Sequence, residues 1–392
     1  MLKQKQDLHG EKGRKRRRAG SKAPIACRRH LRSLAPYPPG RPIEEVQREF
    51  GLKRVIKLAS NENPLGPSPK ALEAIRRHAR EVNLYPDGNV YYLGQALSRH
   101  LRVRPEQLMF GNGSDEIVVW LALAYLSPRD AIIVSEHSFI RYQMAAQLIG
   151  ARWKTIPLTE WRHDLRAMAR AVSSRTRMIF FANPENPVGT MVKRQEFERF
   201  LKAVPPRVLI VLDQAYFEYV QDADYFDGIE YLGRYPNLVV LRTFSKAYGL
   251  AGLRIGYGVA NPKIVTDVNR VRPPFNVNRL AQEAAVAALD DVDFLRQAVE
   301  VNEAGRRYLY GEFERLGLDY VPSQTNFVLI RVGNETCDGT AIAHEMMRRG
   351  VIVRPMAGYE LPDYIRITIG LPAENRLAMR VLEKVVERSG QR

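Results

Sequence analysis

Short apolar runs alternate with amphipathic helical patterns along this 392-residue chain, and this rhythm is the feature that most constrains its fold. The runs are rich in Val, Ile, Leu and Phe, are bounded by turn residues, and cover residues 131–135, 177–182, 207–212 and 238–242. Between them, stretches such as 194–204 place their apolar side chains on one helical face. Continuous apolar strands separated by helices are typical of a mostly parallel sheet covered on both faces, so we expect an α/β fold.

The rhythm changes near residue 275, after a break that contains two consecutive prolines. A long helix is expected from Arg279, followed by strands at 327–332, 351–354 and 364–368 and a terminal helix. The pattern predicts four parts: a basic disordered head at 1–33, an arm with part of a small domain at 34–60, a large domain at 61–275 and a small domain at 276–392.

Charge is concentrated at the start of the chain. The chain has 60 Lys and Arg against 43 Asp and Glu, which gives a net charge of +17, and twelve of these basic residues lie in residues 1–33 with only two acidic ones. Such a segment buries too little apolar surface to become ordered by itself. The rest of the chain is mildly basic, so its charge does not by itself indicate a nucleic-acid-binding protein.

Other features of the sequence bear on where in the cell the protein is found. Two cysteines are too few for a disulfide framework and favour a reducing compartment. The longest uncharged apolar stretch, 117–126, has about half the length that spans a bilayer. The head lacks the apolar segment of a secretory signal. We therefore expect a cytoplasmic protein, and neither a membrane protein nor a secreted one.

Polar side chains follow four of the predicted strands, at 111–116, 183–189, 213–216 and 243–247. In an open parallel sheet, ligands collect beyond the carboxyl ends of the strands. Together these segments contribute a glycine-rich helix start, an amide, a carboxylate, a phenol and a lysine. We expect them to form one site. The dispersed histidines and the two cysteines do not have the spacing of a metal site.

Lys246 follows one of these strands and stands beside Ser245. A lysine in such a position can be simply solvated. Four glycines between residues 249 and 258 follow it, however, so the backbone can approach a ligand closely. A lysine partly desolvated in a pocket has a lowered pKa and can attack a carbonyl group as the free amine. Ser245 and Arg254 would suit a phosphate, because they offer a hydroxyl and a planar cation.

The helix that begins near Ser114 and Asp115 offers a second anion site through its exposed N–H groups, although an ordinary helix cap would have the same sequence. Asp213 ends a fully apolar strand, where a carboxylate needs a cationic partner. That partner could be a structural arginine or a protonated ring nitrogen. In the second case the ring would belong to a bound ligand, and Asn186 and Tyr216 could hydrogen-bond a phenolate oxygen on that ring. Phe139 could stack on the ring or could belong to the core.

The motif at 243–257, Thr-Phe-Ser-Lys-Ala-Tyr-Gly-Leu-Ala-Gly-Leu-Arg-Ile-Gly-Tyr, resembles the lysine signature of class I and II aminotransferases. These are pyridoxal-phosphate enzymes of the type I fold. Segments 61–68, 85–88, 353–354 and 364–370 make the chain most similar to the histidinol-phosphate aminotransferase family. The resemblance covers about residues 31–392.

The resemblance implies roles for the residues already singled out. Lys246 would carry pyridoxal 5′-phosphate covalently and Asp213 would face its ring nitrogen. Asn186 and Tyr216 would hold the ring oxygen, with Phe139 stacked on the ring. The groups around the cofactor phosphate would be Ser114, Asp115, Ser245 and Arg254, with Tyr85 contributed by the neighbouring subunit of a homodimer.

For the substrate, the resemblance implies that Arg366 binds a carboxylate or the phosphate of histidinol phosphate. Arg354 and Tyr37 would complete that pocket, although a strand-end salt bridge would equally explain the two arginines. The motif 183–189 has Glu185 where the family usually has Asn, and 213–216 has Gln214 where it usually has Glu. Both changes spare the residues that would touch the cofactor, and both bear on the substrate.

Three alternatives to a histidinol-phosphate:2-oxoglutarate aminotransferase stay open at this point. An aminotransferase for phenylalanine or tyrosine would use the same carboxylate-binding arginine. A phosphothreonine decarboxylase would need a similar phosphate pocket. A non-catalytic nucleic-acid-binding protein could keep the fold and use the basic head as an electrostatic tether.

Overall fold

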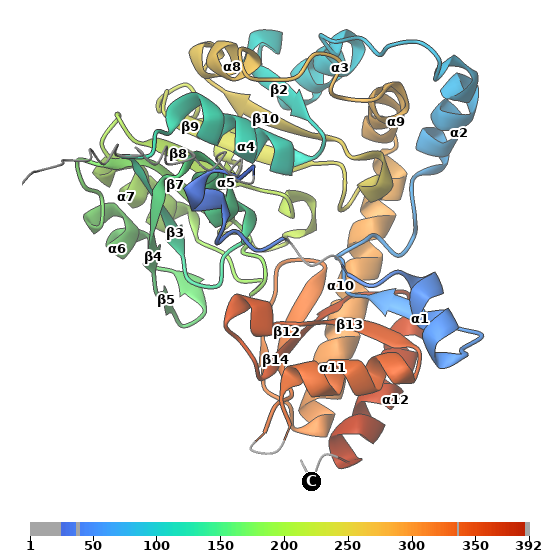
Figure 1. Ribbon diagram of the computed structural model, residues 1–392. Helices are drawn as coiled ribbons and strands as arrows, with labels where there is room; N and C mark the ends of the chain where they lie inside the picture. Colours follow the sequence, from blue (N-terminus) through green and yellow to red (C-terminus); the bar gives the residue numbers. More distant parts are fainter. Residues whose placement is uncertain (1–24, 37–39, 335–336, 389–392) are drawn as a thin grey trace, which may run out of the picture.

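The computed structural model describes residues 25–36, 40–334 and 337–388. Two β-sheets organise these residues, with helices packed on each (Figure 1). The larger sheet has the strand order β2-β10-β9-β8-β7-β3-β4, and the smaller one has the order β1-β13-β14-β12-β11. A two-stranded hairpin, β5 (Leu158–Thr159) and β6 (Arg162–His163), forms a third unit.

The larger sheet is mostly parallel, as the sequence predicts. Its strands are β2 (Leu108–Gly111), β10 (Gly256–Ala260), β9 (Leu238–Thr243), β8 (Leu209–Asp213), β7 (Thr176–Ala182), β3 (Ala131–Ser135) and β4 (Arg152–Ile156). Strands β9, β8, β7, β3 and β4 pair in parallel, whereas β10 is antiparallel to both of its neighbours. The carboxyl ends of β7, β8 and β9 therefore meet at one edge.

Helices cover both faces of this sheet. One face carries α2 (Pro69–His78), α3 (Tyr91–Leu101), α6 (Leu165–Arg170), α7 (Arg194–Ala203) and α9 (Arg279–Leu289). The other carries α4 (Ser114–Tyr125), α5 (Arg141–Ile149) and α8 (Pro262–Asn269). Successive strand residues alternate between the two cores: Phe180 packs with the second group and Phe181 with the first. Both faces being buried explains why the strands are continuously apolar.

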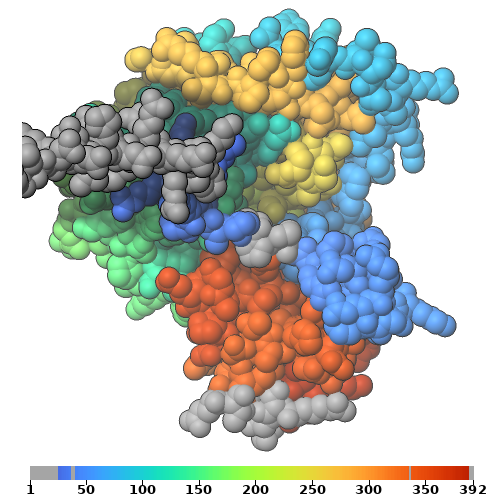
Figure 2. Space-filling view, viewed as in Figure 1, coloured from blue at the N-terminus to red at the C-terminus, as the bar shows by residue number. Residues whose placement is uncertain are grey.

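The smaller sheet joins distant parts of the chain. It contains β1 (Ile56–Leu58), β11 (Tyr320–Val321), β12 (Phe327–Arg331), β13 (Val351–Pro355) and β14 (Tyr364–Thr368). Strand β1 pairs in parallel with β13 although almost 300 residues separate them. The helices packed here are α1 (Ile43–Phe50), α10 (Val292–Leu316), α11 (Gly339–Arg348) and α12 (Pro372–Arg388). Figure 2 shows α1, in blue, packed beside the orange C-terminal residues.

Short 3-10 helices connect these elements. They are η1 (Arg29–Leu31), η2 (Ala79–Glu81), η3 (Pro105–Gln107), η4 (Phe217–Tyr219), η5 (Gly228–Tyr231), η6 (Ala251–Leu253) and η7 (Ala357–Tyr359). The first of them lies against α5, where the His30 ring is 3.2 Å from the Leu148 carbonyl oxygen and the Gln147 amide donates to Ser33. The last residues of the expected disordered head thus include an ordered turn, while residues 1–24 lie outside the described part.

One predicted element differs in the structure. The single long helix expected from Arg279 is two helices, α9 and α10, which are separated at Asp290 and Asp291. Asp291 adopts a non-helical backbone that ends the first helix and begins the second. The division of the chain into domains stays a prediction. Among the described residues, no helix is long and apolar enough to cross a membrane.

Candidate active site

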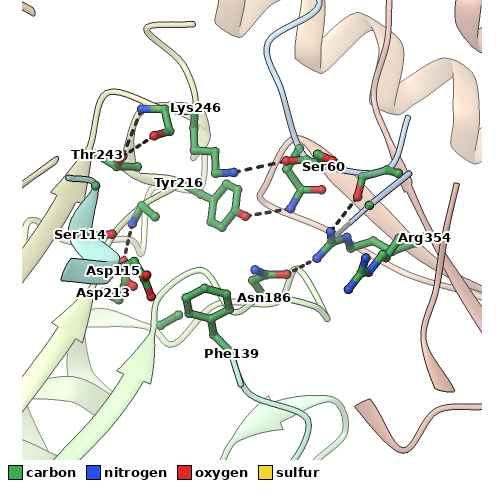
Figure 3. A pocket seen from close by; sticks show the side chains of 18 of the residues that line it. Ser60, Ser114, Asp115, Phe139, Asn186, Asp213, Tyr216, Thr243, Lys246 and Arg354 are labelled. Atoms are coloured by element: carbon green, nitrogen blue, oxygen red, sulfur yellow. Dashed lines mark hydrogen bonds between the residues drawn. The ribbon is translucent and has the colours of Figure 1, made fainter. Parts of the chain in front are cut away.

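A cavity of about 330 Å³ lies where the carboxyl ends of the large-sheet strands face the small sheet (Figure 3). Its wall includes Asp213 at the end of β8, and Lys246 and Asn186 just beyond β9 and β7. Eleven of the thirteen residues predicted for the site line it: Ser114, Asp115, Phe139, Asn186, Asp213, Tyr216, Ser245, Lys246, Arg254, Arg354 and Arg366. A volume in this range suits a small organic ligand.

Lys246 points into this cavity (Figure 3). Its Nζ donates a hydrogen bond of 3.5 Å to the Ser60 carbonyl oxygen and lies 5.6 Å from the centre of the Tyr216 ring. Burial, together with the nearby Arg366 guanidinium, lowers the pKa of Lys246 to about 8. An amine with such a pKa is about one-tenth unprotonated at pH 7, far more than an ordinary lysine, and the unprotonated form is the one that a nucleophile or a proton acceptor requires.

Asp213 lines the cavity at the end of β8 and is only 5% exposed. The Tyr142 hydroxyl donates to Oδ2 over 3.0 Å, and the Ala215 backbone N–H donates to Oδ1 over 3.1 Å. Burial raises the pKa of Asp213 to about 6, because these two neutral donors compensate only part of the lost hydration. A cationic group in the cavity would restore the charged form. Tyr142 was missed by the sequence reasoning, since a tyrosine within a buried helix reads as core.

Two hydrogen bonds fix the polar groups between Lys246 and the small sheet. The Asn61 amide donates to the Tyr216 hydroxyl over 2.8 Å, and the Arg366 guanidinium donates to the Asn186 side-chain oxygen. Asn61 comes from the segment that follows β1, so the small sheet contributes directly to this wall. The sequence placed Asn61 in a family motif but assigned it no contact.

An anion-binding end forms where α4 begins. Gly113 adopts a positive φ of 77°, and a Cβ there would lie 2.7 Å from Nη2 of Arg254. Arg254 donates from Nη1 to the Ser245 hydroxyl over 3.4 Å. The helix start, the Ser114 and Ser245 hydroxyls and Arg254 therefore converge on one region. A helix start that served only as an ordinary cap would not require these groups to come together.

Asp115 and Phe139 lie at the same end with partners of their own. Asp115 forms an ion pair with Arg141 on α5, in which Arg141 Nε donates to Asp115 Oδ1 over 2.6 Å. This contact orients the Asp115 carboxylate. The half-buried Phe139 ring meets the Tyr142 ring edge-on at 5.6 Å and also lines the cavity. Phe139 is therefore both part of the core and part of the wall.

Arg354 and Arg366 are cross-strand neighbours on β13 and β14 and both line the cavity. Arg366 is 7% exposed, donates to the Ala59 carbonyl oxygen over 3.2 Å, and packs its guanidinium 4.9 Å from the centre of the Phe327 ring. Two guanidinium groups side by side make this wall strongly positive. It suits a ligand with more than one anionic oxygen.

Two predicted residues lie elsewhere. Tyr85 is 81% exposed and stacks on Phe275 at 4.9 Å, so a single chain does not bring it to the cavity. Tyr37 lies outside the described residues.

Comparisons with known proteins agree on one family. The family model for aminotransferase class I and II matches residues 53–382. A histidinol-phosphate aminotransferase of Moorella thermoacetica is 49% identical over 373 residues, covering 94% of this chain and 96% of that protein. A second, from Pseudomonas fluorescens, is 48% identical over 92% of this chain and 97% of its own length.

A solved structure is also similar. The histidinol-phosphate aminotransferase of Sinorhizobium meliloti, in complex with pyridoxal 5′-phosphate, superposes with a TM-score of 0.85 and 31% identity, covering 95% of this chain and 99% of that one. The match extends over both sheets that form the cavity. The chain therefore belongs to the class I and II aminotransferases, within the histidinol-phosphate aminotransferase family.

Proposed function

We propose that this enzyme transfers the amino group of histidinol phosphate to 2-oxoglutarate. Its family membership makes it a pyridoxal-phosphate-dependent transaminase. The choice of substrate rests on relatives that are about 48% identical over more than nine-tenths of the chain. The observation that carries the proposal is the cavity, which has an anion-binding end at α4, an amine with a lowered pKa and a paired-arginine wall.

The residues present fit the cofactor at each of its functional groups. Its phosphate matches the cradle built from the start of α4, Ser114, Ser245 and Arg254, with Asp115 beside it. Its basic ring nitrogen matches Asp213, whose pKa of about 6 marks a carboxylate in need of a cation. The remaining proposed contacts are Lys246 to the aldehyde carbon, Asn186 and Tyr216 to the ring oxygen, and Phe139 to the ring face.

The bound cofactor supplies an electron sink for the pair of electrons left at the substrate Cα. This chain's own groups do the rest. Lys246 Nζ would accept the proton from the substrate Cα and later release it, so it would act first as general base and then as general acid. Asp213 holds a proton on the ring nitrogen by its negative charge. The lowered pKa of Lys246 keeps part of the amine free to accept a proton.

The paired arginines fit both substrates of the reaction. Histidinol phosphate carries one phosphate dianion and no carboxylate, whereas glutamate and 2-oxoglutarate carry two carboxylates. Arg366 and Arg354 can serve the dianion together in one half-reaction and carboxylates in the other. Phenylalanine has a single carboxylate and an uncharged side chain. Its side chain would offer the two guanidinium groups no second anionic oxygen.

Steady-state kinetics test the substrate directly. We expect kcat/KM for histidinol phosphate, with 2-oxoglutarate as acceptor, to exceed that for phenylalanine by at least about 10³-fold, because a wall built for charged groups rejects a ligand that lacks them. Lys246→Ala should remove measurable transamination, since loss of the general base alone costs about 10²- to 10⁴-fold. Equal use of phenylalanine would favour the aromatic aminotransferase, and release of carbon dioxide from phosphothreonine would favour the decarboxylase.

We also propose a homodimer in which Tyr85 reaches the cofactor phosphate of the partner subunit. Exposed apolar side chains occur before and at the start of α3 and near residue 275: Val82, Leu84, Tyr85, Tyr91, Tyr92 and Phe275 are 47–81% exposed. An apolar patch of this kind on a folded protein marks an interaction surface. The cytoplasmic location expected from the sequence stays a prediction.

A further inference from the structure

Glu185 and His163 form a buried ion pair directly behind the cavity wall. The Glu185 Oε2 and His163 Nε2 atoms are 2.6 Å apart, and each side chain is 1% exposed. Neither residue lines the cavity, but Asn186, the next residue after Glu185, does. The short contact through Oε2 holds both side chains in one arrangement, although the other Glu185 oxygen, Oε1, is buried without a hydrogen-bond partner among the described residues.

The surroundings of His163 define how this pair is hydrogen-bonded. Nε2 faces two acceptors, the Glu185 carboxylate and the Ala182 carbonyl oxygen at 2.9 Å, so it carries a hydrogen in either charge state. Nδ1 lies 2.5 Å from the Ser135 hydroxyl, which can donate to it or accept from it. Burial by itself would lower the pKa of His163, but the adjacent Glu185 carboxylate offsets this and leaves the pKa raised.

The same carboxylate ties down the turn that carries Asn186. The Ala182 N–H, at the end of β7, donates to Glu185 Oε2 over 3.3 Å. The backbone of Glu185 closes the turn, because its N–H donates to the Thr190 carbonyl oxygen and its own carbonyl oxygen accepts from Gly189. The turn is thus fixed through its backbone at 189–190 and through its side chain to β6 and β7.

Asn186 transmits this anchoring to the small sheet. Its side-chain oxygen accepts a hydrogen bond from Arg366 on β14, so an unbroken series of contacts runs from His163 through Glu185 and Asn186 to Arg366. Rotation of the Asn186 amide by a small angle would break the contact with Arg366 and withdraw the amide from the cavity. Position 185 is also one of the places where the sequence departs from the motif usual in the family that it resembles.

We propose that Glu185 and His163 are positioning residues that hold the Asn186 amide in place and so set the affinity of the site for the cofactor ring and for the substrate anion at Arg366. The inference rests on the proposed role of Asn186. Neither residue touches the reacting atoms. Both act by restricting the turn, in the way that supporting hydrogen bonds orient groups that contact a ligand directly.

The test is the dissociation constant of pyridoxal 5′-phosphate. It is measured by visible absorption as the cofactor is added back to enzyme from which it has been removed. Five variants are compared: Glu185→Gln, His163→Gln, Asn186→Ala, the double variant of Glu185→Gln with Asn186→Ala, and Lys193→Met. The two positioning variants should each raise the constant by about 10-fold or more, because displaced contact groups lose that much. Lys193→Met is the control. It removes an exposed ion pair with Asp224 at a position only a few residues after Glu185, and it should leave the dissociation constant unchanged.

The double variant separates positioning from general destabilisation. If Glu185 acts through the Asn186 amide, Glu185→Gln should change the constant by less than about 2-fold once that amide is absent. KM for histidinol phosphate should also rise more than kcat falls, because Arg366 loses an oriented neighbour. An equal effect of Glu185→Gln with and without Asn186, or no effect in a folded protein, would overturn the inference.

Two further outcomes are distinguishable. If Glu185→Gln fails to fold, His163→Gln carries the test, because it removes the ring that holds the Glu185 carboxylate on one side and contacts the Ser135 hydroxyl on the other. If the wild-type protein binds no cofactor at all, the proposed function fails, whereas normal wild-type binding with unaffected variants defeats only the positioning role.

Discussion

At the scale of single residues, one physical cause tunes the two central groups in opposite directions. Burial disfavours a charge, so it lowers the pKa of Lys246 to about 8 and raises that of Asp213 to about 6. Both shifts move the groups toward neutrality in the protein without ligand. Binding a cofactor with a basic ring nitrogen and an aldehyde would relieve both costs. The site is therefore electrostatically prepared for such a ligand.

Asp213→Asn should stabilise the cofactor-free protein while impairing catalysis. The folded-state pKa lies above the ordinary value of 3.8, so wild-type stability falls as pH rises from about 4 to 6 and stays reduced above that. Removing the charge should raise the free energy of unfolding by about 3 kcal/mol at pH 7.5, and by less at pH 5. Urea unfolding at the two pH values measures this. A variant less stable than the wild type at pH 7.5 would contradict it.

At the scale of elements, the anion-binding end depends on how closely β10 approaches the start of α4. Gly256 pairs with Gly111 of β2 and with Thr243 of β9, so the strand is fixed on both sides. A Cβ at position 256 would collide with the Ser114 backbone nitrogen and lie 2.6 Å from the Gly113 carbonyl carbon. Backbone atoms of a paired strand and a packed helix cannot move aside easily. The absence of a side chain at position 256 thus brings the helix start to Arg254.

Gly256→Ala should therefore weaken cofactor binding by about 10- to 100-fold, because it pushes the helix start away from the Ser245 and Arg254 side of the cradle. Titration with pyridoxal 5′-phosphate measures the change. Gly311→Ala in α10 is a matched control: a Cβ there meets nothing within 4 Å. It should leave the affinity unchanged and stabilise the protein by up to about 1 kcal/mol through helix propensity. Similar affinities for the two variants would contradict the role given to Gly256.

At the scale of the whole molecule, the basic N-terminal segment divides in two. Residues 25–36 lie against α5 through His30 and Ser33, whereas residues 1–24 lie outside the described part. Much of the net charge of +17 belongs to this segment, and the cavity contains its own cluster of Lys246, Arg254, Arg354 and Arg366. The positive charge of the cavity therefore comes from residues of the folded domains.

Deleting residues 1–24 should leave kcat/KM and cofactor affinity unchanged. Deleting residues 1–33 should in addition lower the melting temperature, because the two hydrogen bonds to α5 are lost, each contributing about 1 kcal/mol. Thermal unfolding and steady-state kinetics on both truncated proteins check this. Tight, salt-sensitive DNA or RNA binding that disappears with the deletion, in a protein without transaminase activity, would instead favour the nucleic-acid reading.

The proposed homodimer also belongs to this scale. Leu84→Glu places a charge within the exposed apolar patch and should shift the protein toward monomers, with weaker cofactor binding because Tyr85 of the partner subunit is withdrawn. Sedimentation velocity measures the oligomeric state. Val292→Glu, a similarly exposed position at the start of α10, is the control and should leave it unchanged. A monomeric wild type with full activity would contradict the shared site.

The sequence by itself determined the layered α/β architecture, because the periodicity of apolar residues reports which faces are buried along each element. Strand β3 falls at the predicted residues, and the strand-end segments that carry Asp213, Asn186 and Lys246 meet as expected. The motif around Lys246 could also be identified from the sequence, since its glycines and its lysine lie within one short segment.

Only the tertiary structure decided which residues from distant segments complete the site. Tyr142 donates to Asp213, Asn61 donates to Tyr216, and His163 pairs with Glu185 across separations that no local pattern records. The break between α9 and α10, likewise, follows from a non-helical residue within a region whose apolar pattern continues. Periodicity reports burial along one element, whereas the partner of a buried polar group is set by how elements pack, and that packing minimises the free energy of the whole chain.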